Sequence, residues 1–350
     1  MKTQNVTLKT SEKLASIGSL STMLTAGIPI LEAVDSLLED SKGNQRQILL
    51  TLKEDLMQGT RIYESFSKFP KVFDRVTISV IKASEEAGTL DTTLQDLKKT
   101  IQKETEFIDK VKSALIYPVF VMVVFVAVLL MILIVVVPKI ATVFGKLRVT
   151  LPLPTRILIY LSNFLISNPL LIASGLLGCG FLMWFLMTKK RQALTEIFFN
   201  LPFVTTLIEY IDITRFSRSL HLLLYSGIPI TVALELTKDV VMKKKTAQVI
   251  SNCRDMVFAG KHFSEGLLVT RGYIPAIMIK LIEAGEKTGT LDKSMQEISE
   301  HFDYQVTQTL KTLTSLLEPL LLIAIGIVVG GMMLAIIAPI YNMIGLVGSR

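Results

Sequence analysis

Few side chains in this sequence have the types and spacing of a catalytic or metal-binding site. The three histidines, His221, His262 and His301, lie in no H-E-x-x-H pattern and have no cysteines at ligand spacing, so we predict ordinary helix or surface histidines. No G-x-x-x-x-G-K-[S/T] phosphate loop occurs, so any ATP hydrolysis must belong to a partner. The two cysteines, Cys179 and Cys253, make no disulfide framework, which suits a reducing cytosol. We therefore predict a non-enzyme without metal or cofactor.

Two glutamates, Glu85 and Glu286, are instead candidates for structural or interaction roles. Each stands shortly before a G-T-L-D sequence, which begins at Gly88 in the first case and at Gly289 in the second. We expect the two glycines to end helices, and Leu90 and Leu291 to begin the apolar stripe of the next helix. Each carboxylate could be solvated, could cap a helix or could contact a partner protein, and the residues alone leave these roles open.

Both motifs belong to a sequence repeat. At an offset of 200, Leu20, Leu24, Gly27, Pro29 and Ala33 recur as Leu220, Leu224, Gly227, Pro229 and Ala233. After one inserted residue the offset is 201, which relates Gly59, Glu64, Ala83, Glu85 and Gly88 to Gly260, Glu265, Ala284, Glu286 and Gly289. So many matches in register indicate a duplicated helical domain. Gly27 and Gly227 should lie just past a helix end, with Pro29 and Pro229 in the first turn of the next helix.

Three charge-free segments, 113–138, 157–188 and 319–349, each exceed the roughly 20 residues that a helix needs to cross a bilayer. The first and third are copies of one design, because Pro118 and Pro138 recur as Pro319 and Pro339. Three segments of this length, together with 50% hydrophobic residues, favour three transmembrane helices over buried core helices.

One long helix is predicted to join the first charged region to the first span. Apolar residues keep helical spacing from Thr89 onwards and nothing interrupts them before Pro118, so the helix could run on to Val137 as one rod. Pro118 removes one backbone hydrogen bond and would bend the rod at the membrane surface, as Pro319 would in the second copy. A break into separate helices is the alternative.

The whole layout is that of an all-α membrane protein with two duplicated cytoplasmic helical-bundle domains. Residues 1–112 and 189–318 form the domains, the spans cover 113–138, 157–188 and 319–341, and a loop (139–156) and a tail (342–350) lie outside the cytoplasm. Lysines before the first span and after the second favour a cytoplasmic N-terminus, although the loop also carries basic residues. The net charge is +7, but each domain is close to neutral, so no nucleic-acid partner is expected.

A transporter or channel is the competing class of function. Such proteins usually place ionisable groups within the membrane, whereas here only Glu318 stands at a span boundary, as an interface residue or as a specific partner contact. Small residues favour close helix packing instead: Gly326 and Gly330 share one face of the third span, and Ser174 and Gly178 share one face of the second. This packing could occur within one chain or between chains.

The repeat, the G-I-P-I sequence of each first hairpin, A-G-E-K-T-G-T-L-D from Ala284 and L-P-L-P-T-R from Leu151 resemble one family. They are similar to the inner-membrane platform proteins of type II secretion systems and type IV pili, the GspF/PilC family. The resemblance implies a multi-pass scaffold in the cytoplasmic membrane, with about six helices in each of two cytoplasmic bundles. It also implies coupling of a hexameric ATPase to pilin or pseudopilin polymerisation, contacts with other inner-membrane assembly proteins, and a homo-oligomer.

Overall fold

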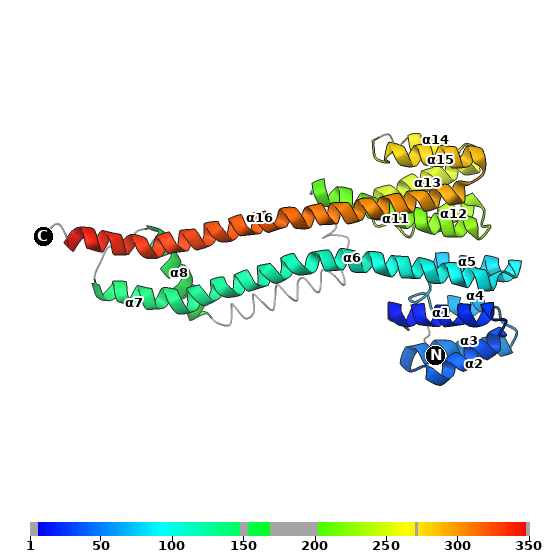
Figure 1. Ribbon diagram of the computed structural model, residues 1–350, viewed down its shortest axis with the longest axis horizontal. Helices are drawn as coiled ribbons and strands as arrows, with labels where there is room; N and C mark the ends of the chain where they lie inside the picture. Colours follow the sequence, from blue (N-terminus) through cyan, green and yellow to red (C-terminus); the bar gives the residue numbers. More distant parts are fainter. Residues whose placement is uncertain (1–5, 148–152, 169–201, 270–271, 348–350) are drawn as a thin grey trace. The chain divides into compact units, whose positions relative to one another are not determined.

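The computed structural model describes residues 6–147, 153–168, 202–269 and 272–347, and these form helices and turns without a strand (Figure 1). The predicted all-helical fold class is therefore confirmed for the described residues. The chain divides into two compact units. The first unit contains Met1–Lys110 and Thr206–Gln308, and the second contains Val111–Thr205 and Thr309–Arg350. Most of the two ranges predicted as separate domains thus falls within one unit.

The first unit is built from two sets of helices that follow each other in the same order (Figure 1). The first set is α1 (Thr10–Thr25), α2 (Ile30–Asp40), α3 (Gly43–Met57), α4 (Ile62–Ser67), α5 (Arg75–Ala87) and the start of α6 (Leu90–Met131). The second set is α11 (Pro202–Tyr225), α12 (Ile230–Thr237), α13 (Lys244–Phe258), α14 (Phe263–Leu268), α15 (Ala276–Thr288) and the start of α16 (Leu291–Val347). Both α5 and α15 have 13 residues, and both α4 and α14 have 6.

A single cluster of buried apolar side chains runs through both sets of helices. Ile81 of α5 and Ile282 of α15 are fully buried, and they stand 201 residues apart in the sequence. Leu97 and Ile298, about two turns into α6 and α16, have the same separation and are also buried. The helical spacing of apolar residues therefore places matching positions of the two sets in one core.

The α6 helix begins in the first unit and continues into the second without ending at Pro118. After Met131 the chain passes through the π-helical segment η2 (Ile132–Val136) and directly into α7 (Val137–Leu147), so the helix also continues through Pro138. In η2 the N–H of Val137 bonds to the carbonyl of Ile132, five residues back. This wider turn makes room for the ring of Pro138, which would otherwise meet a carbonyl of the preceding turn. The bend predicted at Pro118 stays a prediction.

Much of the predicted loop 139–156 is helical. α7 occupies its first part, and α8 (Leu153–Ser167) begins at its end, so Leu153 and Pro154 stand in the first turn of a helix and not in a loop. α8 packs against η2 and α7, and the buried residues of this packing include Leu133, Val137, Phe144 and Ser162. The rest of the second predicted span, with Cys179, Ser174 and Gly178, lies outside the described residues.

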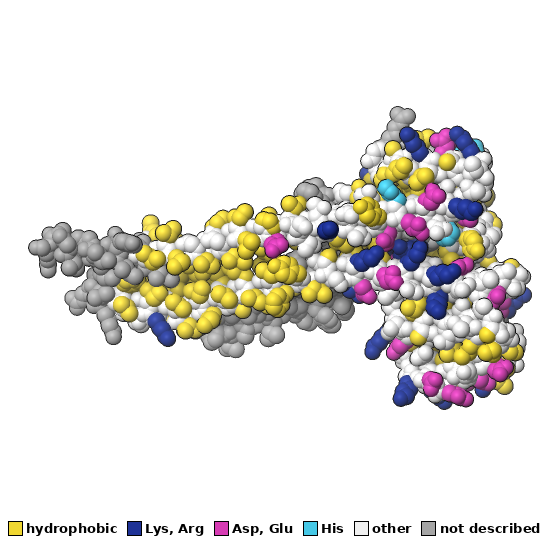
Figure 2. Space-filling view, viewed as in Figure 1, with side chains coloured by type: hydrophobic (Ala, Val, Ile, Leu, Met, Phe, Trp, Pro, Cys, Tyr) yellow, Lys and Arg dark blue, Asp and Glu magenta, His cyan; other side chains and the backbone are white. Residues whose placement is uncertain are grey.

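Among the described residues, two helical stretches are long and apolar enough to cross a membrane, Leu90–Phe144 and Leu291–Ala335. Their apolar parts are mostly exposed: Val123 on α6 is 61% exposed and Ile327 on α16 is 70% exposed. Figure 2 shows hydrophobic side chains spread over the surface of these parts, while charged side chains gather on the first unit. Exposed apolar surface of this extent is typical of helices that contact lipid or another protein.

Candidate functional site

The predicted turn after the first hairpin helix is built in the same way in both sets. Gly27 follows α1 with φ of +80°, in the left-handed region that glycine adopts without a Cβ clash. The Gly27 N–H bonds to Leu24 at 2.9 Å and the Ile28 N–H bonds to Met23 at 3.0 Å, which satisfies the last carbonyls of α1. Gly227 (φ +78°) ends α11 with the same pair of bonds at the same distances, from Gly227 to Leu224 and from Ile228 to Leu223.

Pro29 and Pro229 stand one position earlier than predicted. Each is the residue just before the helix, with Ile30 and Ile230 as the first helical residues. Their carbonyls accept the first intrahelical bonds, from Ala33 at 3.0 Å and from Ala233 at 2.9 Å. The prolines therefore fix the entry to α2 and α12 through their restricted φ of −58° and −55°.

Gly88 and Gly289 end α5 and α15 in the left-handed conformation, with φ of +72° and +70°. The next helix begins two residues later, at Leu90 for α6 and at Leu291 for α16, and both leucines pack partly buried against the core. These four residues thus make the tight connection from a short helix to a long one.

Glu85 and Glu286 cap helices within the chain. The Glu85 carboxylate accepts the backbone N–H of Ile62 at 3.0 Å and that of Tyr63 at 3.3 Å, at the N-terminus of α4. Glu286 accepts the N–H of Phe263 at 2.5 Å and, through its other oxygen, that of Ser264 at 3.0 Å, at the N-terminus of α14. A carboxylate at a helix N-terminus satisfies free N–H groups and interacts favourably with the helix dipole. Of the roles left open by the sequence, the structure shows capping.

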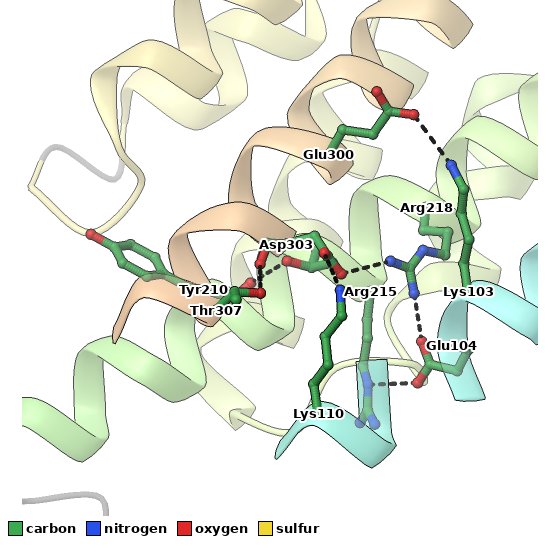
Figure 3. A network of polar contacts seen from close by, with 10 residues as sticks. Lys103, Glu104, Lys110, Tyr210, Arg215, Arg218, Glu300, Asp303 and Thr307 are labelled. Carbon is green, nitrogen blue, oxygen red and sulfur yellow. Dashed lines mark hydrogen bonds and ion pairs between the residues drawn. The ribbon is translucent and has the colours of Figure 1, made fainter. Parts of the chain in front are cut away.

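Arg218 on α11 is a buried charged residue of the first unit that contacts both long helices, α6 and α16 (Figure 3). Its side chain is only 10% exposed, and it donates to Glu104 of α6 at 3.0 Å and to Asp303 of α16 at 3.3 Å. The guanidinium carbon also lies 5.7 Å from the ring centroid of Phe107 on α6. A single arginine of the second set therefore holds the polar parts of α6 and α16 together, which a planar group with five donors can do.

Further ion pairs surround Arg218 in Figure 3. Arg215 lies 3.0 Å from Glu104, Lys110 lies 3.4 Å from Asp303, and Lys103 lies 3.2 Å from Glu300. The lysines come from α6, while Asp303 and Glu300 come from α16, so two ion pairs join the long helices directly, and Glu104 of α6 pairs with the arginines of α11. We call Lys103, Glu104, Lys110, Arg215, Arg218, Glu300 and Asp303 the charged cluster.

The sequence reasoning did not find the charged cluster. Its central residues are not shared by the two repeats: Gly18 stands where the repeat would match Arg218, and Gln102 stands where it would match Asp303. An arginine inside the apolar stripe of α11 was the available signal, since a buried charge must be paired.

Asp212 of α11 is a buried carboxylate that was also not predicted from the sequence. It is fully buried and accepts the N–H of Met242 at 2.7 Å, the N–H of Lys243 at 2.9 Å and the hydroxyl of Thr246 at 3.1 Å. Burial raises the pKa of Asp212, and these hydrogen bonds act against that rise. The carboxylate thus fixes the start of α13. The side chain of Lys243 also pairs with Glu209 at 2.9 Å.

In the predicted spans, Pro118 and Pro319 both lie inside continuous helices, α6 and α16. A Cβ placed on Gly326 or Gly330 would meet no described atom within 4 Å. Within the part of the chain that the structure describes, these glycines therefore have no close helix partner. Packing through Gly326 and Gly330 stays a prediction, for a partner helix outside the described residues or in another chain.

Across the described residues, no group of three or more histidine, cysteine, aspartate or glutamate side chains is placed to hold a metal ion. His221 bonds through Nδ1 to the carbonyl of Asp292 at 2.8 Å, and the His262 side chain is 69% exposed. The described functional candidates are thus helix caps, turns and ion pairs between helices.

This combination defines a class: an all-helical protein with two sets of short helices that lead into long apolar helices of membrane-spanning length. The chain belongs to the family of type II secretion system (T2SS) protein F, whose model matches it twice, over residues 17–138 and 216–339. It is 31% identical to the type IV pilus assembly protein PilC of Thermus thermophilus over 330 residues, which cover 93% of this chain and 81% of that protein. It is 29% identical to the type II secretion system protein F of Pseudomonas aeruginosa over 337 residues, covering 94% and 82%.

Proposed function

We propose that this chain is the integral-membrane platform of a type IV pilus or type II secretion machine. In this role it couples a cytoplasmic assembly ATPase to the polymerisation of pilins or pseudopilins. The proposal includes two duplicated helical domains, spans at 113–138, 157–188 and 319–341, and a cytoplasmic N-terminus. The names of the relatives, a type IV pilus assembly protein and a type II secretion system protein, support a role in such a machine. Because the sequence contains no phosphate loop, the proposal assigns the ATPase activity to a partner.

The observation that carries the proposal is the course of α6 and α16. Each starts at a leucine packed against the core of the first unit and runs as a helix into an apolar stretch of spanning length. A continuous helix carries displacement along its axis, because its backbone hydrogen bonds resist extension. We infer that a partner that moves the short helices also moves the membrane parts of α6 and α16.

The charged cluster supports the same proposal. Because Arg218 binds Glu104 and Asp303 together, a force on either set of helices reaches both long helices. The platform is expected to act as a homo-oligomer among other inner-membrane assembly proteins, with pilins meeting its exposed apolar helices.

An insertion in α6 after Lys112 tests this transmission. Seven glycine and serine residues at that point should abolish piliation or secretion, because a flexible linker transmits no axial force. The matched control is a seven-residue alanine-rich helical insertion, about two turns long, which preserves helix and rotational phase. We expect the control to retain at least partial assembly at equal membrane abundance. Unimpaired assembly by the flexible variant would contradict the proposed coupling.

A further inference from the structure

Two backbone carbonyls of the second unit lose their helical partner to a proline and, among the described residues, belong to buried positions, Ala335 and Leu133. The carbonyl of Ala335 on α16 would normally accept the N–H of residue 339, but residue 339 is proline and has no N–H. Ala335 is only 3% exposed, so water does not readily replace the missing donor. The hydroxyl of Thr155 on α8 donates to this carbonyl at 2.5 Å.

The second carbonyl is that of Leu133 in η2. Its α-helical donor would be the N–H of Val137, which instead bonds to Ile132. Its π-helical donor would be residue 138, again a proline without an N–H. Leu133 is 5% exposed, and the hydroxyl of Ser162 on α8 donates to its carbonyl at 2.5 Å.

Both donors therefore belong to α8, and both prolines belong to the sequence repeat. Thr155 and Ser162 are seven residues apart, which is about two helical turns, so they share one face of α8. Both are buried, at 3% and 0% exposure. Two other described hydroxyls of this unit behave differently: Thr142 bonds to Lys139 and Thr314 bonds to Leu310, each within its own helix.

We propose that Thr155 and Ser162 are positioning residues that fix α8 against two proline-containing helices by supplying the donors that Pro339 and Pro138 lack. The pairing is specific: Thr155 bonds to the carbonyl that Pro339 leaves without a donor, and Ser162 bonds to the carbonyl that Pro138 leaves without one. In apolar surroundings an unpaired carbonyl is strongly disfavoured, so each hydroxyl selects one placement of α8 along its partner helix. This role does not depend on the machine that the chain serves.

The test uses the full chain in detergent or lipid nanodiscs and compares melting temperatures. Thr155→Val keeps the shape but removes the donor, and we expect a fall of about 2–4 °C, whereas Thr155→Ser should stay near the unmodified protein. Thr314→Val is the matched control, because the Leu310 carbonyl keeps the N–H of Thr314 as its helical donor. It should change the melting temperature by less than Thr155→Val.

Proline replacement separates a hydrogen-bonding role from simple packing. Pro339→Ala restores the N–H that reaches Ala335, so it should recover most of the loss caused by Thr155→Val. Pro138→Ala should not do so, but it should rescue Ser162→Ala. Additive effects, or equal rescue of Thr155→Val by both alanine variants, would overturn the proposal. If Thr155→Val fails to accumulate in membranes, the same comparison is made on abundance, and failure of Pro339→Ala to restore it would equally overturn the proposal.

Discussion

Arg218 of α11 donates from Nη1 to Oε2 of Glu104 on α6 at 3.0 Å, so a residue of the second set of helices is anchored on the first long helix. The other end of the same guanidinium reaches Asp303 on α16. The pair is sheltered, with the arginine side chain 10% exposed and the glutamate side chain 32% exposed. Shielding from water makes such a contact stronger than an ion pair on the surface.

Replacing Arg218 by methionine should destabilise the first unit. Glu104 and Asp303 keep Arg215 and Lys110 as partners, so we expect a loss of about 1.5–3 kcal/mol, the range for hydrogen bonds to charged groups. Chemical unfolding of the purified protein, followed by circular dichroism, measures this loss.

Arg75→Met is the matched control for Arg218→Met. Arg75 also pairs across the two sets, with Asp239 at 2.9 Å, but both side chains are at least half exposed. Its loss should lower the free energy of unfolding by less than about 1 kcal/mol. Equal losses of unfolding free energy for the two variants would show that the buried contacts of Arg218 stabilise the first unit no more than an exposed ion pair does.

The capping glutamates predict a different pattern. Glu286→Gln replaces one of the two accepting carboxylate oxygens by an NH2 group, which donates and cannot accept a backbone N–H, so it should cost about 1–2 kcal/mol and speed amide hydrogen exchange at Phe263 and Ser264. Glu283→Gln, a change in an exposed pair with Lys287 on the same helix, is the control and should leave this exchange unchanged. An effect of Glu286→Gln on assembly with unchanged exchange would instead favour a contact with a partner protein.

The ends of the short helices could be predicted from the sequence, because the repeat shows the same turn residues twice. The G-I-P-I and G-T-L-D sequences placed helix ends at Gly27, Gly88 and their counterparts, where left-handed φ values are found. The place of Pro29 was off by one residue, since proline suits both the position before a helix and its first turn. The role of Glu85 and Glu286 could not be chosen, because α4 and α14 are distant in sequence from the carboxylates that cap them.

Cys253 provides a prediction about reactivity. It is fully buried on α13, and Gly266 of α14 lies so close that an added Cβ would come within 2.9 Å of the sulfur. Burial raises the pKa of the Cys253 thiol to about 12, so the thiol stays protonated and inert at pH 8. In a Cys179→Ala background, maleimide should label it only after denaturation, whereas Lys261→Cys, at an exposed position, should react in the native protein. Rapid native labelling of Cys253 would contradict the described packing of α13 on α14.

The membrane part was harder to predict than the first unit. Composition indicated the apolar segments, and two of them form helices of spanning length. The helix was expected to run to Val137 and a loop to follow at 139–156, yet the chain stays helical past Pro138, because a π-helical turn and a hydroxyl from α8 compensate for the missing N–H. Such compensation depends on contacts between segments that are far apart in sequence, which neither hydropathy nor helical spacing encodes.

The most direct test of the proposed platform is its topology in intact cells. Single cysteines are placed at positions 68, 261 and 146 in a background without Cys179 and Cys253, and a membrane-impermeant maleimide is added from outside. We predict labelling at position 146 alone, which places both sets of short helices in the cytoplasm, where an assembly ATPase can reach them. Labelling at positions 68 and 261 with protection of 146 would invert the topology and contradict the proposed coupling to a cytoplasmic motor.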